Sequence, residues 1–306
     1  MSVEQYQNFC DRVALIMPGV EIKKDELMSK HTTFRIGGPA DLFVSPYAEE
    51  IPGLLRLAKE DQIPVTIIGN GSNLLVADKG IRGLVIEIGK GLESISFEGN
   101  RVTVGAGTLL SRLANAAAEN NLTGLEFAAG IPGSVGGAVV MNAGAYGGEM
   151  KDVLVEVKVL DEHGEEKVLS LEELDLSYRH SCILENNYIV VEATMDLQMG
   201  MEDLIREKMA KLRDQRVEKQ PLEFPSAGST FKRPEGYFAG KLIMDAGLRG
   251  YTVGGAQVSE KHCGFVINKG GATAADVCKL MKDVNDKVVA QFGVALEPEV
   301  KMVGEF

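Results

Sequence analysis

The chain has 306 residues, of which 45% are hydrophobic and 25% charged, which is ordinary for a globular protein and enough for two domains. Its net charge of −12 at pH 7 argues against a general nucleic-acid or anionic-membrane surface, because phosphate groups attract basic patches. No run approaches the roughly 18 apolar residues of a membrane span. The first residues lack the pattern of a signal peptide, and the cysteines and histidines lack metal-ligand spacing. We therefore expect a cytoplasmic protein without a metal site.

Hydrophobic periodicity predicts short strands mixed with helices along the first 200 residues. We expect helices over 5–16, 51–61 and 108–120, and strands over 41–45, 65–68, 74–77, 84–88, 95–97 and 101–104, with further short strands between 153 and 197. A charged helix over 201–219 should stop before Pro221. Near the end, Thr273 and Asp276 have the spacing of a capping box and predict the start of another helix. Because the composition changes near residue 199, we expect a first domain over 1–198, its core about 34–198, and a second over 199–306.

Two clusters of glycine stand out, since glycine makes up about 11% of the chain against a usual ~7%. The first, Gly69-Asn70-Gly71-Ser72-Asn73, directly follows the predicted strand 65–68. Its amides could bind a pyrophosphate, or it could be a tight turn, for which Asn-Gly is a strong signal. These residues alone do not decide between a pyrophosphate site and a tight turn.

The second cluster runs from Gly130 to Gly137 and is followed by Asn142-Ala143-Gly144-Ala145-Tyr146-Gly147. The apolar stretch Ala138-Val139-Val140-Met141 between these two parts predicts burial, and a buried loop must satisfy its backbone polar groups, which a bound ligand would do. The chain contains neither GxGxxG before a helix nor a P-loop. A nucleotide would therefore bind by another architecture.

Three further motifs are weak when taken singly. Tyr178-Arg179-His180-Ser181 resembles an ordinary surface pair, and Leu296-Glu297-Pro298-Glu299-Val300 resembles solvated carboxylates in a terminal strand. The loop 226–234 contains two cations and several hydroxyl groups, which suits a phosphate or carboxylate site or simply a basic loop. The residues by themselves indicate a phosphate- or nucleotide-binding enzyme.

Taken in order, these motifs resemble the UDP-N-acetylenolpyruvoylglucosamine reductase family. The resemblance starts at 31–38, continues through both glycine clusters and the three weaker motifs, and so spans nearly the whole chain. It implies an α+β protein with an FAD-binding domain of the vanillyl-alcohol-oxidase type in two subdomains. A C-terminal α+β substrate-binding domain would follow, whose last strand could return to the first subdomain.

The resemblance also implies an activity and its reactants. Non-covalent FAD would be the cofactor and NADPH the hydride-donating cosubstrate, and the enolpyruvyl ether of UDP-N-acetylglucosamine would be reduced to UDP-N-acetylmuramate for peptidoglycan synthesis. Nucleic acid, membrane and metal would not be partners, and we expect a monomer or weak oligomer. The alternatives are a flavin oxidase of the same fold acting on another substrate and a non-catalytic flavin-binding module.

Site residues follow from the same motifs. The resemblance implies catalytic roles for Arg179, Ser229 and Glu299, the last preferred over Glu297 because it directly precedes the apolar strand residue. Substrate contacts are expected from Lys219, Lys232 and Arg233, although some relatives have asparagine at the position of Arg233. The short spacing between Arg179 and Ser229 suits the subgroup without a tyrosine-bearing lid loop. The expected cofactor-binding residues are Arg35, Gly69, Asn70, Gly71, Ser72, Asn73, Leu74, Gly130, Ile131, Pro132, Gly133, Ser134, Gly136, Gly137 and Asn142.

Overall fold

The computed structural model describes residues 3–306 and divides the chain into two compact units. Unit 1 contains the residues up to Lys24, Leu42–Asn70 and Gly83–Gln215, and unit 2 contains Asp25–Asp41, Gly71–Arg82 and Arg216–Phe306. Both units are therefore discontinuous in sequence. Among residues 3–306, no helix is long and apolar enough to cross a membrane.

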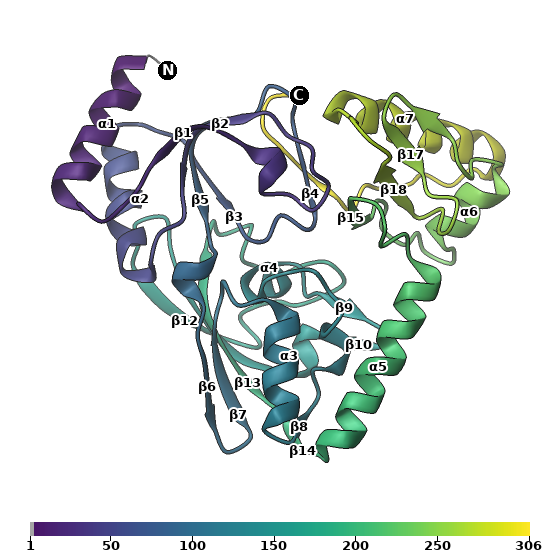
Figure 1. Ribbon diagram of the computed structural model, residues 1–306, viewed down its shortest axis with the longest axis horizontal. Coiled ribbons are helices and arrows are strands. Elements are labelled where there is room, and N and C mark those ends of the chain that lie inside the picture. The colour runs from purple at the N-terminus through teal and green to yellow at the C-terminus, as the bar shows by residue number, and fades with distance from the viewer. Residues whose placement is uncertain (1–2) are drawn as a thin grey trace. The chain divides into compact units, whose positions relative to one another are not determined.

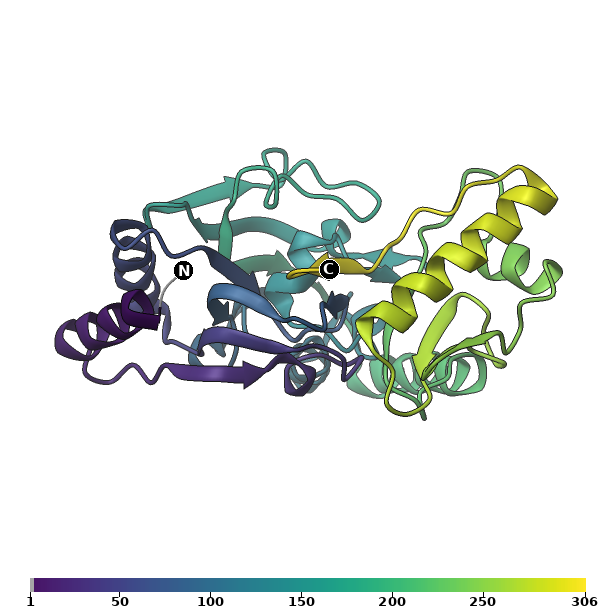
Figure 2. The ribbon, with the colours of Figure 1, turned by 90° about the horizontal axis from the view of Figure 1, so that it is seen from above.

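Unit 1 begins with two helices that pack on each other, α1 (Val3–Ile16) and α2 (Ile51–Glu60); both lie at the N-terminal end of the ribbon in Figure 2. β3 (Val65–Ile68) pairs in parallel with β5 (Ile81–Glu87). Together with β1 (Lys23–Leu27) and β2 (Pro39–Val44), they form a sheet in the order β1-β2-β5-β3. The chain crosses between the units within β1, β2 and β5.

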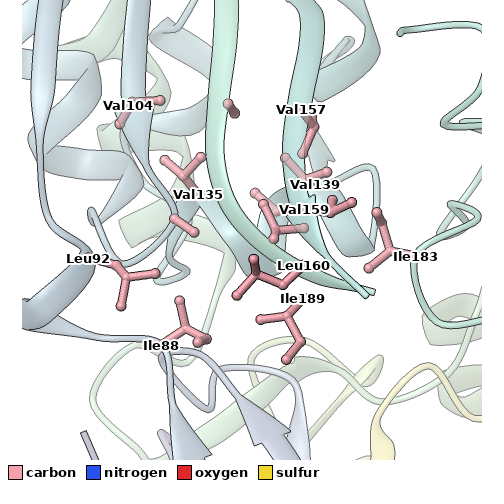
Figure 3. Packing of buried hydrophobic residues seen from close by; sticks show 14 of the residues in the cluster. Ile88, Leu92, Val104, Val135, Val139, Val157, Val159, Leu160, Ile183 and Ile189 are labelled. Carbon is pink, nitrogen blue, oxygen red and sulfur yellow. The ribbon is translucent and has the colours of Figure 1, made fainter. Parts of the chain in front are cut away.

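A five-stranded antiparallel sheet forms the larger part of unit 1, in the order β12-β11-β13-β7-β6; all of its strands except β11 are labelled in Figure 1. Its strands are β6 (Ile95–Glu98), β7 (Arg101–Gly105), β11 (Leu154–Leu160), β12 (Glu166–Ser170) and β13 (Ile189–Asp196). The short helix α4 (Val135–Val140) contacts β7 and β13. Its Val135 and Val139 belong to the same buried cluster as Val104, Val157 and Ile189 (Figure 3).

The remaining elements of unit 1 are short, apart from α3 (Leu110–Glu119). β8 (Leu122–Thr123) pairs with β14 (Gln198–Met199), and β9 (Gly144–Ala145) pairs with β10 (Gly148–Glu149). Along the chain, 3-10 helices occupy Met28–Lys30, Ala48–Glu50, Lys90–Leu92, Glu126–Ala128 and Met150–Asp152. The long helix α5 (Glu202–Lys219) contains the boundary between the units.

Unit 2 has a four-stranded antiparallel sheet in the order β15-β18-β17-β16. The strands are β15 (Ser226–Ser229), β16 (Thr252–Val253), β17 (Ala256–Val258) and β18 (Phe265–Asn268). Helix α7 (Ala274–Phe292) contacts β16, β17 and α6 (Ala239–Asp245). The last strand, β19 (Lys301–Val303), pairs in parallel with β4 (Leu74–Val76), so the end of the chain returns to its N-terminal third.

Side-chain hydrogen bonds explain why two early segments belong to unit 2. The Asp78 carboxylate accepts the Ala274 and Ala275 amides at 2.7 and 2.9 Å, a favourable place for an anion at the start of α7. Thr33 Oγ1 donates to the Ser226 carbonyl at 2.7 Å. The expected break at residue 199 assumed contiguous domains. The structure instead divides the chain within α5 and assigns two N-terminal segments to the C-terminal unit.

Strongly periodic segments were predicted well, and weakly periodic ones were missed. The capping box of Thr273 and Asp276 at the start of α7 is confirmed. Helices α4 and α6 were not expected. In α4 the pair Gly136-Gly137 lowers intrinsic helix propensity, and burial of the valines against the sheet compensates for it.

Candidate active site

The two glycine clusters meet within unit 1. Asn70 Nδ2 donates to the Pro132 carbonyl at 2.6 Å, and a Cβ added to Gly69 would lie only 2.7 Å from Ser134 Oγ. Residues 69–70 and 130–134 thus form one feature, which we call the paired glycine loops. An alanine at position 69 would push against the Ser134 side chain, so glycine allows this close approach without moving the hydroxyl group.

Ser134 has a buried hydroxyl group beside the paired loops. The residue is 2% exposed, and within the part of the chain that the structure describes its Oγ has no hydrogen-bond partner. An unsatisfied buried polar group costs roughly 1–3 kcal/mol. A polar atom of a bound cofactor would satisfy this hydroxyl, so the paired loops fit a nucleotide cofactor.

Gly136 and Gly137 lie in α4 and differ in their surroundings. The Gly136 amide donates to the Ala106 carbonyl at 2.8 Å, and its added Cβ would lie 3.0 Å from Ala106 Cβ. The Val135 amide likewise donates to the Thr108 carbonyl at 2.8 Å. Gly136 therefore allows close packing of α4, whereas Gly137 is exposed. The structure gives Gly136 a role in packing that needs no ligand.

The second half of the first glycine cluster belongs to unit 2. Gly71 has φ +61°, and an added Cβ would lie 2.0 Å from the His31 carbonyl oxygen. Asn73 Nδ2 donates to the carbonyl of Glu299 at 3.2 Å, and the Lys301 amide donates to the Asn73 carbonyl at 2.9 Å. The Asn73 side chain therefore supports the backbone of a predicted catalytic residue, a link that sequence spacing did not suggest. Ser72 is half-buried, and Leu74 opens β4.

Arg179 lies at the tip of a two-residue turn. Ser177 and His180 exchange backbone hydrogen bonds of 3.2 and 3.1 Å, with Tyr178 and Arg179 between them. The Arg179 guanidinium lies 5.2 Å from the centre of the Tyr178 ring. Asn142 Nδ2 donates to the Ser177 carbonyl at 3.1 Å. The Arg179 turn, residues 177–180, is therefore tied to the segment that follows α4.

Three of the predicted site residues other than glycine have left-handed backbone. Arg35, Asn142 and Arg179 have φ of 54°, 40° and 57°. Non-glycine residues rarely adopt this conformation, and when they do they are often at functional sites. Arg35 is exposed in unit 2, whereas Asn142 is 1% exposed in unit 1.

Ser229 and Glu299 lie on adjacent segments of unit 2. The Glu299 amide donates to the Thr230 carbonyl, and the Lys232 amide donates to the Glu297 carbonyl, both at 2.8 Å. Ser229 ends β15 opposite Phe265. Glu299 is buried, whereas the Glu297 side chain is 70% exposed and forms an ion pair with Lys232. Burial thus agrees with the preference for Glu299.

The expected substrate-binding cations are at the surface of unit 2. Lys219 is exposed at the end of α5. The Lys232 ammonium pairs with Glu297, and the Arg233 guanidinium lies 4.0 Å from the centre of the Phe238 ring. Phe238 is itself 61% exposed. The loop after Ser229 therefore presents positive charge and an exposed ring together, which suits an anionic ligand with a flat base.

His262, which is not among the expected site residues, lies next to the Ser229 strand. Its Nδ1 accepts the Gly264 amide at 3.1 Å, and the Gly264 carbonyl accepts the Thr230 amide at 2.9 Å. Burial lowers the pKa of His262, which favours the neutral ring that this contact requires. His262 therefore supports the backbone next to Ser229.

Two family models match the chain: residues 41–170 match an FAD binding domain, and residues 220–303 match the C-terminal domain of UDP-N-acetylenolpyruvoylglucosamine reductase. The reductase of that name from Agathobacter rectalis is 61% identical, over 98% of this chain and 99% of the relative. The crystal structure of UDP-N-acetylenolpyruvylglucosamine reductase from Thermus caldophilus has 37% identity and a TM-score of 0.80, over 93% of this chain and 98% of that one.

A more distant structure shows the fold alone. The 4-ethylphenol oxidase from Gulosibacter chungangensis matches 65% of this chain and 44% of its own, with 18% identity and a TM-score of 0.51. The first part of the chain thus has the FAD-binding fold of the vanillyl-alcohol-oxidase type. From the identity to the Agathobacter protein over nearly the full length, we conclude that this chain belongs to the UDP-N-acetylenolpyruvoylglucosamine reductase family.

Proposed function

We propose that this chain reduces UDP-N-acetylenolpyruvoylglucosamine to UDP-N-acetylmuramate with NADPH and FAD, using Arg179, Ser229 and Glu299 as catalytic residues. Family membership supports the reaction and both redox partners. The observation that carries the assignment of residues is the backbone pairing of Thr230 with Glu299, because it places two of the three on adjacent segments. We further propose a cytoplasmic monomer or weak oligomer.

The paired glycine loops are our proposed FAD site, with Ser134 Oγ as a hydrogen-bond partner of the cofactor. Bound FAD supplies hydride transfer from NADPH to the vinyl group of the substrate. The glycines would let the backbone approach the cofactor closely, and Asn70 fixes one loop to the other. We propose non-covalent binding, so acid precipitation should release yellow cofactor into the supernatant, and a yellow pellet would contradict it.

The protein's own groups handle charge and protons at the enolpyruvyl ether. As hydride arrives at the terminal carbon, negative charge develops on the neighbouring carbon and its carboxylate. Arg179 and Glu299 are proposed to polarise the enolpyruvyl group and to stabilise that charge. The Ser229 hydroxyl would give its proton to the neighbouring carbon, a general-acid role.

The cations of unit 2 are proposed to bind the nucleotide part of the substrate. Lys219, Lys232 and Arg233 are partly or fully exposed and could meet the diphosphate by charge-assisted hydrogen bonds. Lys232 would have to exchange its pairing with the exposed Glu297 carboxylate for a phosphate. That exchange costs little, because exposed ion pairs contribute only about 0–1 kcal/mol.

The experiment that tests the activity is an anaerobic titration of the yellow protein. NADPH should bleach the flavin absorbance, and UDP-N-acetylenolpyruvoylglucosamine should then restore it with formation of UDP-N-acetylmuramate. Reoxidation by oxygen but not by this substrate would favour an oxidase of the same fold. Failure of NADPH to bleach the flavin would favour a non-catalytic flavin module.

A further inference from the structure

We propose that Asn142 and Ser181 form a clamp that holds the Arg179 turn against α4, which makes Asn142 a positioning residue for Arg179 and not a flavin ligand. The inference rests on the catalytic role of Arg179 in the proposed function. It changes the role that the family resemblance implied for Asn142.

The Asn142 side chain is occupied by contacts within unit 1. Its Nδ2 donates to Glu149 Oε2 at 2.9 Å and to the Ser177 carbonyl at 3.1 Å, and its Oδ1 accepts the Lys151 amide at 3.0 Å. These partners fix the orientation of the amide, because a carbonyl can only accept and a backbone amide can only donate. Both N–H groups are therefore used by the protein and none is left to donate to a flavin.

Ser181 holds the other side of the same turn. Its hydroxyl donates to the Val140 carbonyl at 2.8 Å, and the residue is 3% exposed. The hydrogen bond from Asn142 holds Ser177, before Arg179, and the hydrogen bond from Ser181 holds the turn after Arg179. Each connects to the C-terminal end of α4 or the residues just beyond. A turn held at both ends can present its tip in only a narrow range of positions.

Helix α4 extends this constraint to the paired glycine loops. It has six residues and is therefore about 9 Å long, with Ser134 before its first residue and Val140 as its last. Val135 and Val139 lie in the core together with Ile183, just beyond the clamp (Figure 3). This packed helix thus joins the proposed cofactor loops at one end to the Arg179 turn at the other.

The clamp matters because the Arg179 side chain is long and its turn is strained. A guanidinium that stabilises developing charge must sit at a fixed distance from the reacting carbon, and misplacement by about 1 Å can cost about 100-fold in rate. The positive φ of Arg179 disfavours the turn when nothing holds it. The hydrogen bonds from Asn142 and Ser181 would offset that cost.

The test uses the FAD-loaded enzyme and the variants Asn142→Asp and Ser181→Ala. Asn142→Asp keeps the acceptor for Lys151 and removes both donors. The clamp predicts FAD affinity and NADPH reduction within about twofold of wild type, and substrate reduction slower by about 10- to 100-fold. Asp161→Asn is the matched control, because Asp161 also holds a turn of unit 1 through two backbone amides. It should leave both half-reactions unchanged.

A double-mutant cycle with Arg179→Ala separates positioning from general support. In that background Asn142→Asp should slow substrate reduction no further, because its effect acts through Arg179. An additive effect, weakened FAD binding or equal slowing of both half-reactions would overturn the clamp. If Asn142→Asp does not fold, the same cycle with Ser181→Ala decides. A normal rate for Arg179→Ala alone would instead refute the proposed role of Arg179.

Discussion

The two regions that contribute the proposed catalytic groups are held in different ways. Arg179 sits on a turn tied down by side chains, through Asn142 and Ser181. Ser229 and Glu299 sit on segments tied together by backbone hydrogen bonds, through Thr230. A backbone network survives most side-chain replacements, whereas a side-chain clamp is lost when one residue changes. Replacing the Ser229 side chain should therefore change the reaction without disturbing the fold. The contribution of Arg179 should instead depend on the side chains that hold its turn.

The largest effect is expected at Ser229, which lies on the segments that backbone hydrogen bonds hold together. Ser229→Ala should leave the pairing of Thr230 with Glu299 intact and remove only the proton donor. Flavin reduction by NADPH should stay near wild type, and reoxidation by substrate should slow by about 10²–10⁴-fold, roughly 3–5 kcal/mol of barrier. Stopped-flow absorbance measures both phases. Equal slowing of the two, or of neither, would remove Ser229 from the mechanism.

Lys219→Ala addresses a residue whose expected role is limited to substrate binding. Losing one charge-assisted contact with the UDP phosphates should cost roughly 1.5–3 kcal/mol, which is about a 10- to 150-fold rise in KM. Flavin reduction should barely change. Lys211→Ala, exposed on the same helix, is the control and should leave KM unaltered. An unchanged KM in Lys219→Ala would show that this lysine does not meet the substrate.

Gly71→Ala probes the close backbone packing of unit 2. The new methyl would lie 2.0 Å from the His31 carbonyl oxygen, and relief of such a clash typically costs about 1–3 kcal/mol. Gly99 has nearly the same φ, +62°, with nothing within 4 Å of its added Cβ, so Gly99→Ala measures the conformational cost alone. Urea unfolding of both variants should show the larger loss at position 71. Equal losses would mean that the contact with His31 relaxes freely.

The smallest effect is expected at Asp161, whose side chain holds a turn. It is a difference in stability that depends on pH. Backbone hydrogen bonds from Glu165 and His163 lower the pKa of Asp161 to about 2. Because the folded pKa lies below the unfolded value of about 3.9, the stabilisation is complete above pH 4–5 and is lost as the pH falls towards 2. Asp161→Asn should therefore be less stable than wild type at pH 6, and the difference in urea midpoints should shrink near pH 2–3. A constant difference would contradict this.

The sequence predicted the elements better than their long-range connections. Helix α7 could be predicted because its capping box and apolar stripe are formed by residues that lie close together in the sequence. The discontinuous units could not be predicted, because the hydrogen bond that the Ala274 amide donates to Asp78 joins residues 196 positions apart and leaves no periodic signal. The site shows the same limit: the motif around Asn142 was noticed, but its partner Ser177 lies 35 positions later. The catalytic roles of Arg179, Ser229 and Glu299 remain predictions.

The parallel pairing of β19 with β4 has a consequence for how the chain is made. Protein synthesis runs from the N-terminus, so β4 leaves the ribosome more than 200 residues before β19. Until then the edge of β4 lacks its partner, and an unpaired strand edge is a site of aggregation. Segments 25–41 and 71–82 are likewise synthesised before residues 83–215 of unit 1, and therefore long before the rest of unit 2. Unit 2 can therefore be completed only after β19 has been synthesised, and its folding is slowed by the closure of a very long loop.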